Sequence, residues 1–331
     1  MNIKLVFIAF GLFLLAVPAA AQTCSFTPQT SALPTLKGRV VYTDQSTGQI
    51  GMYDFNTAST VSIPSAVNSL GTSTDQITNP VFSPDGKALL FSGVATGQRH
   101  LFYWVIGTTT VTNLTSPQGN LRHEDGKFSP NGAKIVWKRD GNIVTADLST
   151  SGTPSLSNIV AVTTNGVLGT ATEASGPVYG QSMQFIYYFT GNSTYTEQLQ
   201  RYSYIDGSVT AVFPADGLQY YYPTSPDLYD LIYVRWISFT NHHDEIQLYL
   251  TLLNSRYIWG AADCAADNSD PAPVDERYFI YSRDNNTGLG AGQYELYLAQ
   301  MKNGSAAWLL PSAINVGGSA SLIGANYTNA R

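Results

Sequence analysis

The sequence predicts an all-β protein in which six four-stranded sheets form a ring, and three observations support this prediction. One pattern recurs along the chain at intervals of 46 to 50 residues, which suits one four-stranded sheet per repeat. No segment combines a 3.6-residue apolar period with capping residues, so little helix is expected. The chain has 21 Tyr, 14 Phe and 29 Gly but only 12% charged residues, which describes a large globular protein and not a disordered tail.

The repeat is clearest in residues 79–92 and 125–138, where Ser-Pro-Asp-Gly or Ser-Pro-Asn-Gly precedes a strongly apolar strand. Weaker copies occupy residues 176–188, 222–233 and 270–281. Pro fixes φ and Gly supplies the positive φ of a tight turn, so each copy predicts a strand, a turn and a second strand. A third strand and a polar fourth strand complete each unit, as in residues 100–106 and 109–114.

The ends of the chain predict how the ring closes. The first strand-like run, residues 38–44, matches the second strand of a unit, and residues 320–329 supply the missing first strand. The C-terminal strand is therefore expected to complete the first unit, which removes an open sheet edge. The expected units are residues 38–70 with 320–331, then 77–115, 123–165, 173–215, 219–260 and 267–311. Seven units remain an alternative if residues 151–172 or 311–326 contain further strands.

The Ser-Pro-Asp-Gly turn followed by an apolar strand resembles the PD40 repeat of TolB-like β-propellers, strongly over residues 77–150 and more weakly to 311. The resemblance implies a single six-bladed β-propeller over residues 38–331. It implies little about function, because propellers host binding scaffolds, peptidases, glycosidases and polysaccharide lyases. A weaker similarity connects the chain to propeller lyases, among them oligogalacturonate lyases, which pair the propeller with a His-rich metal site.

The N-terminus predicts export. Residues 1–21 combine Lys4, an apolar run and Ala19-Ala20-Ala21, as a signal peptide does, and residues 22–37 would form a tail before the propeller. The expected location is secreted or periplasmic, with no membrane span after signal removal. An oxidising compartment favours a disulfide between Cys24 and Cys264, two unpaired thiols being the alternative. A net charge of −6 argues against a nucleic-acid partner.

Loops between blades and loops between second and third strands share one face of a propeller, and the Pro-Asp-Gly turns occupy the other. The turn residues Asp85, Asn131 and Asp227 are therefore expected to form Asx turns without a catalytic role. All four histidines map to the first face, which is the predicted working face. There His123 is the expected general base of a β-elimination on a uronic-acid glycan, with Tyr220 as a second proton carrier. Arg99 or Arg283 would neutralise the substrate carboxylate.

The predicted substrate-binding residues on the same face combine histidines, acids, an amide and an aromatic ring that could stack on a sugar: His100, Glu173, Gln219, Trp236, His242, His243 and Asp267. Glu173 and Asp267 could alternatively form a carboxylate pair for glycoside hydrolysis. No cofactor is certain, and a divalent metal at the histidines stays open. The expected partner is an oligosaccharide or polysaccharide. The alternative is a non-catalytic TolB-like propeller that binds a glycan or an extracellular or envelope protein.

Overall fold

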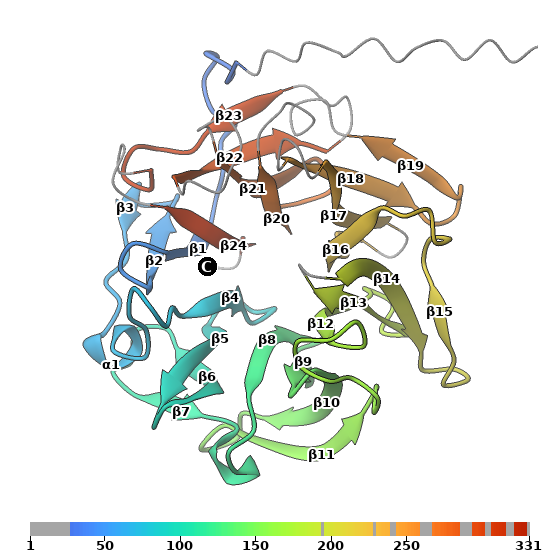
Figure 1. The fold of residues 1–331 in the computed structure, drawn as a ribbon. Helices are drawn as coiled ribbons and strands as arrows, with labels where there is room; N and C mark the ends of the chain where they lie inside the picture. The colour runs from blue at the N-terminus through green and yellow to red at the C-terminus, as the bar shows by residue number, and fades with distance from the viewer. Residues whose placement is uncertain are drawn as a thin grey trace, which may run out of the picture.

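Six four-stranded antiparallel sheets surround a central axis in the computed structural model (Figure 1). The structure describes residues 27–192, 195–227, 230–238, 243–258, 267–284, 293–301, 306–315 and 321–329, without the side chains at 192, 195, 196, 237, 238 and 243. The all-β, six-bladed prediction is confirmed. In the described part of the chain, helix is limited to α1 (Ser65–Asn68) and the 3₁₀ turn Ser116–Gln118.

Blade 1 is built from both ends of the chain, as predicted. The C-terminal strand β24 (Leu322–Thr328) pairs antiparallel with β1 (Arg39–Asp44), and β2 (Gln49–Asp54) and β3 (Ser59–Thr60) complete the sheet. Arg39 lies opposite both Asp54 of β2 and Thr328 of β24, so β1 is paired on one side with the next strand in the sequence and on the other side with the C-terminal strand. The C-terminal strand therefore closes the ring.

The other five blades follow in chain order, each running from the innermost to the outermost strand. Blade 2 holds β4 (Thr78–Phe82), β5 (Ala88–Ala95), β6 (Gln98–Val105) and β7 (Val111–Asn113). Blade 3 holds β8 (His123–Phe128), β9 (Lys134–Arg139), β10 (Asn142–Ser149) and β11 (Ser155–Ala161). Blade 4 holds β12 (Ala174–Tyr179), β13 (Phe185–Asn192), β14 (Tyr195–Ser203) and β15 (Val209–Ala211). Blade 5 holds β16 (Gln219–Thr224), β17 (Asp230–Ser238), β18 (His243–Leu250) and β19 (Ser255–Ile258). Blade 6 holds β20 (Asn268–Pro273), β21 (Tyr278–Asp284), β22 (Tyr294–Gln300) and β23 (Ala307–Leu309).

The turns between first and second strands are held by their own side chains. In blade 2, Asp85 Oδ1 accepts hydrogen bonds from Ser83 Oγ at 2.6 Å and from the Lys87 amide at 3.1 Å. In blade 3, Asn131 Oδ1 likewise accepts from the Ala133 amide at 3.1 Å. In blade 5, Asp227 Oδ1 accepts from the Asp230 amide at 2.7 Å. These side chains stabilise turns, as the sequence predicted.

The hydrophobic core lies between neighbouring blades. Val41 and Met52 of blade 1 pack with Phe91 and Trp104 of blade 2, for example, and equivalent clusters fill the later interfaces. Apolar strands buried on both faces suit this arrangement, because every blade is covered by two others. The innermost strands are thereby fixed around the axis, where the candidate site lies.

The N-terminal tail lies against blade 6. The Gln29 amide donates to the carbonyl oxygen of Ala307 at 2.7 Å, and Trp308 Nε1 donates to Ser31 Oγ at 3.1 Å. The predicted signal peptide, Cys24 and Cys264 lie outside the described residues, so the cleavage and the disulfide stay predictions. Among the described residues, no helix has the length and apolar character needed to cross a bilayer.

Candidate functional site

Every innermost strand carries a bulge at the same place. One residue of each strand has a positive φ there, between 46° and 59°: Asn79, Asp125, Gly176, Tyr222, Asp270 and Gly324. Register shifts occur at the same points. Gly, Asn and Asp tolerate this conformation, whereas a tyrosine there is strained. The bulges direct side chains at the central channel and determine its chemistry.

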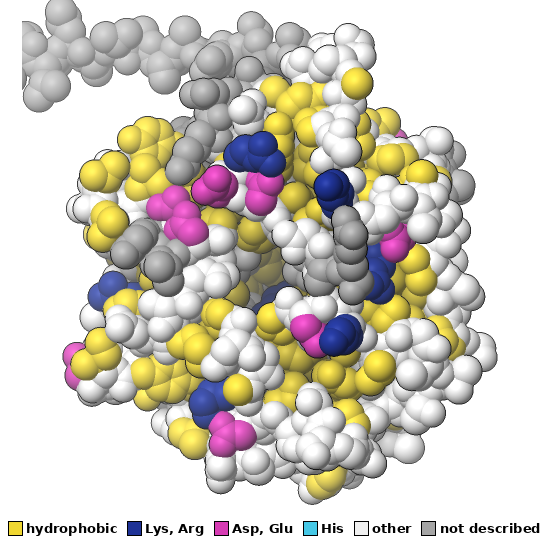
Figure 2. All heavy atoms as spheres, turned by 180° about the vertical axis from the view of Figure 1, so that it is seen from behind, with side chains coloured by type: hydrophobic (Ala, Val, Ile, Leu, Met, Phe, Trp, Pro, Cys, Tyr) yellow, Lys and Arg dark blue, Asp and Glu magenta, His cyan; other side chains and the backbone are white. Residues whose placement is uncertain are grey.

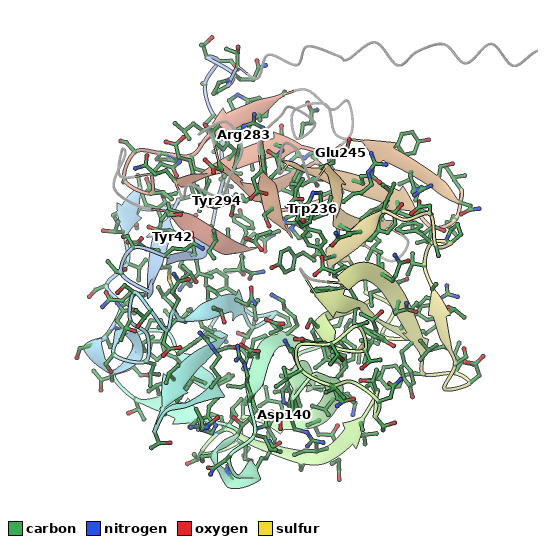
Figure 3. All side chains as sticks on the ribbon, viewed as in Figure 1. Tyr42, Asp140, Trp236, Glu245, Arg283 and Tyr294 are labelled. Atoms are coloured by element: carbon green, nitrogen blue, oxygen red, sulfur yellow. The ribbon has the colours of Figure 1, made fainter. Side chains whose placement is uncertain are left out.

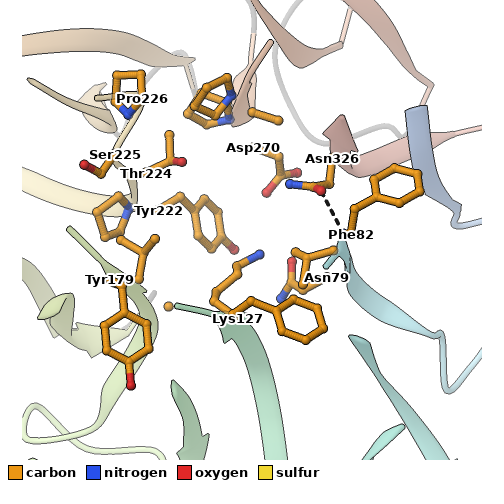
Figure 4. Close-up of a pocket in the computed structure, with 18 of the residues that line it drawn as sticks. Asn79, Phe82, Lys127, Tyr179, Tyr222, Thr224, Ser225, Pro226, Asp270 and Asn326 are labelled. Carbon is orange, nitrogen blue, oxygen red and sulfur yellow. Dashed lines mark hydrogen bonds between the residues drawn. The ribbon is translucent and has the colours of Figure 1, made fainter. Parts of the chain in front are cut away.

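The channel contains a lower cavity of about 350 Å³ on the face of the Pro-Asp-Gly turns. Figure 2 shows this face hollowed at its centre. Prolines and aromatic side chains form much of the wall, and the side chains of Lys127 and Tyr222 point toward the axis (Figure 4). Lys127 interacts electrostatically with Asp125 and Asp270, while burial lowers its pKa. In the lower cavity, the positive charge of Lys127 is therefore balanced by Asp125 and Asp270.

A second cavity of about 290 Å³, called the upper cavity here, lies on the opposite face, where the blade-joining loops meet. It is lined by carboxylates and aromatic rings with a few other side chains: Gln45, Glu197, Tyr221, Tyr222, Trp236, Asp244, Asp267, Ser269, Asp270, Tyr294 and Ile323. Tyr222 and Asp270 line both cavities and lie where they meet. Trp236 stands beside the central opening in Figure 3.

Burial and crowding perturb the acids of the upper cavity. Burial, with a smaller contribution from Glu173, raises the pKa of Glu197 to about 7. Burial raises the pKa of Asp270 to about 6. Burial and the neighbouring Asp267 hold the pKa of Asp244 well above its usual range, although a hydrogen bond with Tyr221 opposes the shift. Glu197, Asp244 and Asp270 therefore keep their protons to higher pH than ordinary carboxyl groups do.

The predicted base, His123, lies outside both cavities. It is fully buried, its Nδ1 accepts a hydrogen bond from Trp137 Nε1 at 2.9 Å, and its ring lies nearly parallel to that of His100 at 6.1 Å. Burial, followed by the charges of His100 and Arg139, lowers the pKa of His123 to about 4. His100 is 5% exposed, and its Nδ1 pairs with Thr115 Oγ1 at 3.1 Å. Both rings pack between blades 2 and 3, and neither residue lines a cavity.

The two predicted arginines also bind protein groups. Arg99 donates to the carbonyl oxygen of Gln76 at 2.9 Å and lies 3.4 Å from Glu124. Arg283 is 4% exposed and donates to Asn268 Oδ1 at 2.8 Å. Neither lines a cavity, so the structure does not bring a guanidinium and His123 to a shared ligand.

Three further candidates are buried between blades. Tyr220 packs on Phe213, and its hydroxyl donates to Asp216 Oδ2 at 2.5 Å. Glu173 forms an ion pair with Lys138. Gln219 is 6% exposed. None of the three lines either cavity.

The structure does place Trp236 and Asp267 together in the upper cavity. Tyr294 donates a hydrogen bond to Asp267 Oδ2, and Asp267 Oδ1 is buried without a hydrogen-bond partner in the described structure. His242 and the side chain of His243 lie outside the described residues. The described part of the chain contains no group of three or more His, Cys, Asp or Glu residues able to hold a metal ion.

Six residues of the upper cavity are not among the site residues predicted from the sequence: Glu197, Tyr221, Tyr222, Asp244, Asp270 and Tyr294. The repeat could have found Asp270, because it occupies the same place in its repeat as Asn79 and Asp125. Glu197 and Tyr294 come from third strands, whose starts the weak repeats of blades 4 and 6 do not mark.

Comparison with known proteins extends the fold assignment. No family model matches the sequence, and no curated protein matches it. TolB from Acinetobacter baumannii superposes with a TM-score of 0.64 at 18% identity over 88% of this chain and 66% of that one. A putative TolB from Agrobacterium tumefaciens gives 0.57 at 15% identity, over 88% and 98% of the two chains.

An oligogalacturonate lyase in complex with manganese aligns less well, with a TM-score of 0.48 at 16% identity over 83% of this chain and 74% of that one. That value supports no inference about shared chemistry. Similarity at these identities concerns the fold alone. The sequence repeat, the ring closure and these superpositions together show that the chain has the fold of a TolB-like six-bladed β-propeller.

Proposed function

We propose that this propeller is an exported carbohydrate-binding protein whose ligand occupies the upper cavity. The observation that carries the proposal is the combination of Trp236 and three tyrosines with four carboxylates in one opening of about 290 Å³. Sugar rings stack their C–H faces on aromatic planes, and carboxylates accept hydrogen bonds from sugar hydroxyls. The volume is close to the lower end for small-ligand pockets, about 300 Å³.

A lyase reaction has less support from this geometry than binding has. β-Elimination from a uronic acid needs a cation at the carboxylate and a base near neutral pKa. Among the described residues, the lining of the upper cavity includes neither Lys, Arg nor His. The residues predicted for those roles, His123, Arg99 and Arg283, are committed to protein contacts. We therefore propose glycan binding as the primary activity.

Titration calorimetry with neutral, acidic and cationic oligosaccharides tests the proposal, with absorbance near 235 nm followed in parallel. Trp236→Ala should weaken binding at least about tenfold, because the stacking surface is lost. Trp308→Ala is the matched control, since Trp308 lies on the outermost strand of blade 6 and contacts the N-terminal tail. Binding that survives Trp236→Ala would contradict the proposed site, and a rise at 235 nm would establish a lyase instead.

Export and the disulfide belong to the same proposal. N-terminal sequencing of the exported protein should give Gln22, and thiol titration should find Cys24 and Cys264 both oxidised. An intact Met1 in the mature protein would contradict export. Two titratable thiols would contradict only the disulfide.

A further inference from the structure

The upper cavity has an unbalanced charge. Four carboxylates line it, from Glu197, Asp244, Asp267 and Asp270, and its described lining includes no cationic side chain. Nearby arginines are engaged elsewhere: Arg235 lies 2.6 Å from Glu245, and Arg283 donates to Asn268. Buried carboxylates normally have a cationic partner or several hydrogen-bond donors. Among the residues that the structure describes, the lining of this cavity therefore supplies no positive group.

Glu197 shows the deficit most clearly. Its side chain lines the cavity, only 9% of the residue is exposed, and it forms no hydrogen bond or ion pair with any residue that the structure describes. Its electrostatic neighbours are other acids, Glu173 and Asp244 among them. A buried, unpartnered carboxylate that faces a cavity is costly unless a ligand supplies the missing donor.

Asp244 and Asp267 present a second version of the same deficit. The two carboxyl groups lie within hydrogen-bonding reach, and burial together with the Asp267 carboxyl holds the pKa of Asp244 well above its usual range. Tyr221 also bonds to Asp244, and Tyr294 donates to Asp267. A cation placed between the two carboxyl groups would replace the proton that the raised pKa keeps on Asp244.

The aromatic walls suit an organic cation. The rings of Tyr221 and Tyr222 meet edge to face, 5.1 Å apart and at 80° to each other, and Trp236 lines the same space. All three aromatic residues line the upper cavity, and an aromatic face turned toward an ammonium group attracts it. A metal ion is less well served, because the described residues include no group of three suitable ligands.

Lys127 does not neutralise the whole cavity. It lines the lower cavity and faces Asp125 and Asp270, so its charge is shared between two acids at the junction of the cavities. No basic group is among the causes that raise the pKa of Glu197 or the pKa of Asp244. The missing charge thus belongs at the mouth of the channel, beside Glu197.

We propose that the upper cavity recognises a saccharide that carries protonated amino groups, with an ammonium group between Glu197, Asp244 and the rings of Tyr221 and Tyr222. The inference rests on the proposed function, since it names the class of carbohydrate bound there. It reverses the charge of the uronic-acid ligand expected from the sequence. A polyanionic glycan would bring further negative charge into a cavity that already holds four carboxylates.

Three tetrasaccharides of similar size separate the alternatives: β-1,4-linked glucosamine, its fully N-acetylated form and tetragalacturonate. Calorimetry at mildly acidic pH should show the glucosamine tetramer binding at least about tenfold more tightly than the neutral tetramer. Glu197→Gln keeps the side-chain volume and should remove most of this preference. Asp75→Asn is the control, because it removes one exposed negative charge near Arg99 and outside the cavity.

The outcomes distinguish the two proposals. Equal binding of the neutral and cationic tetramers, or tightest binding of tetragalacturonate, would overturn the inference and leave carbohydrate binding standing. Binding of none of the three would overturn both. Loss of the preference in Asp75→Asn as well as in Glu197→Gln would show a long-range charge effect and would also overturn the inference.

Proton release provides a measurement that does not depend on a variant. A tetramer with trimethylammonium groups has a charge that does not titrate, so any proton released on binding comes from the protein. Titration near neutral pH in two buffers of different ionisation enthalpy should show release of about one proton per ligand, from Glu197, Asp244 or Asp270. Binding without proton release would contradict the site.

Discussion

Acidic side chains at the blade interfaces differ between two regions of the propeller: in one they pair with cations, and in the other they face a cavity. Where blades 3 and 4 meet, Glu124 lies 2.7 Å from Arg122 and 3.5 Å from Lys138, and Lys138 also pairs with Glu173. Where blades 4, 5 and 6 meet, Glu197, Asp244 and Asp267 face a cavity without a cation in its described lining. Burial alone would raise the pKa of Glu124, but Arg122 and Lys138 outweigh it and the pKa falls.

The half with paired acids is structural, and the half with unpaired acids is the one that we propose binds a ligand. Paired acids stabilise contacts between blades and leave no charge for a ligand. Unpaired acids lower the free energy of unfolding of the protein without a ligand. A cation that binds the folded state would raise it again. The residues predicted from the sequence as catalytic, His123 and Arg99, belong to the paired half, which explains why they do not reach a ligand.

The largest effect is expected from Lys138→Met, which would turn the paired half into an unpaired one. Glu124 and Glu173 would lose a buried cation, and the free energy of unfolding should fall by about 4 kcal/mol at neutral pH. Denaturant unfolding measures this change. An unchanged midpoint would show that Arg122 and Arg99 already neutralise Glu124.

His123→Ala tests whether His123 is structural. The change leaves a cavity and deprives Trp137 Nε1 of its acceptor, so the free energy of unfolding should fall by about 2 to 3 kcal/mol while glycan affinity stays within twofold. The folded pKa of about 4 lies below the unfolded value, so the native state disfavours the imidazolium. His123 therefore makes the protein lose stability as pH falls from about 6.5 through 4, and the variant should lose less. A large loss of affinity at unchanged stability would restore a functional role.

Glu197→Gln should raise the free energy of unfolding, whereas His123→Ala should lower it. The folded pKa of Glu197, about 7, lies above the unfolded value, so the native state retains the proton and loses stability as pH rises from about 4.5 through 7. The variant removes this loss and should be more stable than the parent by about 2 kcal/mol at pH 8, with no difference at pH 4. Thermal unfolding at both pH values measures it. A destabilised variant at pH 8 would mean that Glu197 has a partner after all.

Tyr222→Gly should change stability least. Glycine relieves the positive φ of 46°, which offsets the loss of ring contacts with Tyr221 and Phe189, so the free energy of unfolding should change by less than about 1 kcal/mol. Tyr221→Gly is the matched comparison. Tyr221 is 8% exposed with an ordinary backbone, and its removal should cost about 3 kcal/mol. Equal effects at the two positions would show that Tyr222 is not strained.

The sequence predicts the fold well because its information is local and repeated. Ser83-Pro84-Asp85-Gly86 specifies a turn by its own chemistry, and the same chemistry recurs one blade later. The closure also follows from the sequence, because residues 38–44 lack an innermost neighbour that residues 322–328 supply. Neither conclusion requires knowledge of side-chain direction.

The site is predicted less well because it depends on the direction in which each side chain points from its strand. A bulge shifts the alternation within each innermost strand, so Tyr220 faces the blade interface while Tyr222 faces the channel. The repeat offset that selected His123 and Gln219 correctly finds the first residue of the innermost strand. At that position, however, these side chains are buried and do not face the channel. Asp267 and Trp236 are the predicted residues that do face the ligand space.

The pairing of β24 with β1 also sets the order of events in folding. Val40 of β1 pairs with Tyr327 of β24, so blade 1 is complete only when strands from the two ends of the ring have met. Until then blade 1 has an exposed inner edge, and contacts of such high sequence separation form slowly. Closure of the ring is therefore expected to be a slow step of folding, because it joins the described strands that lie farthest apart in the sequence.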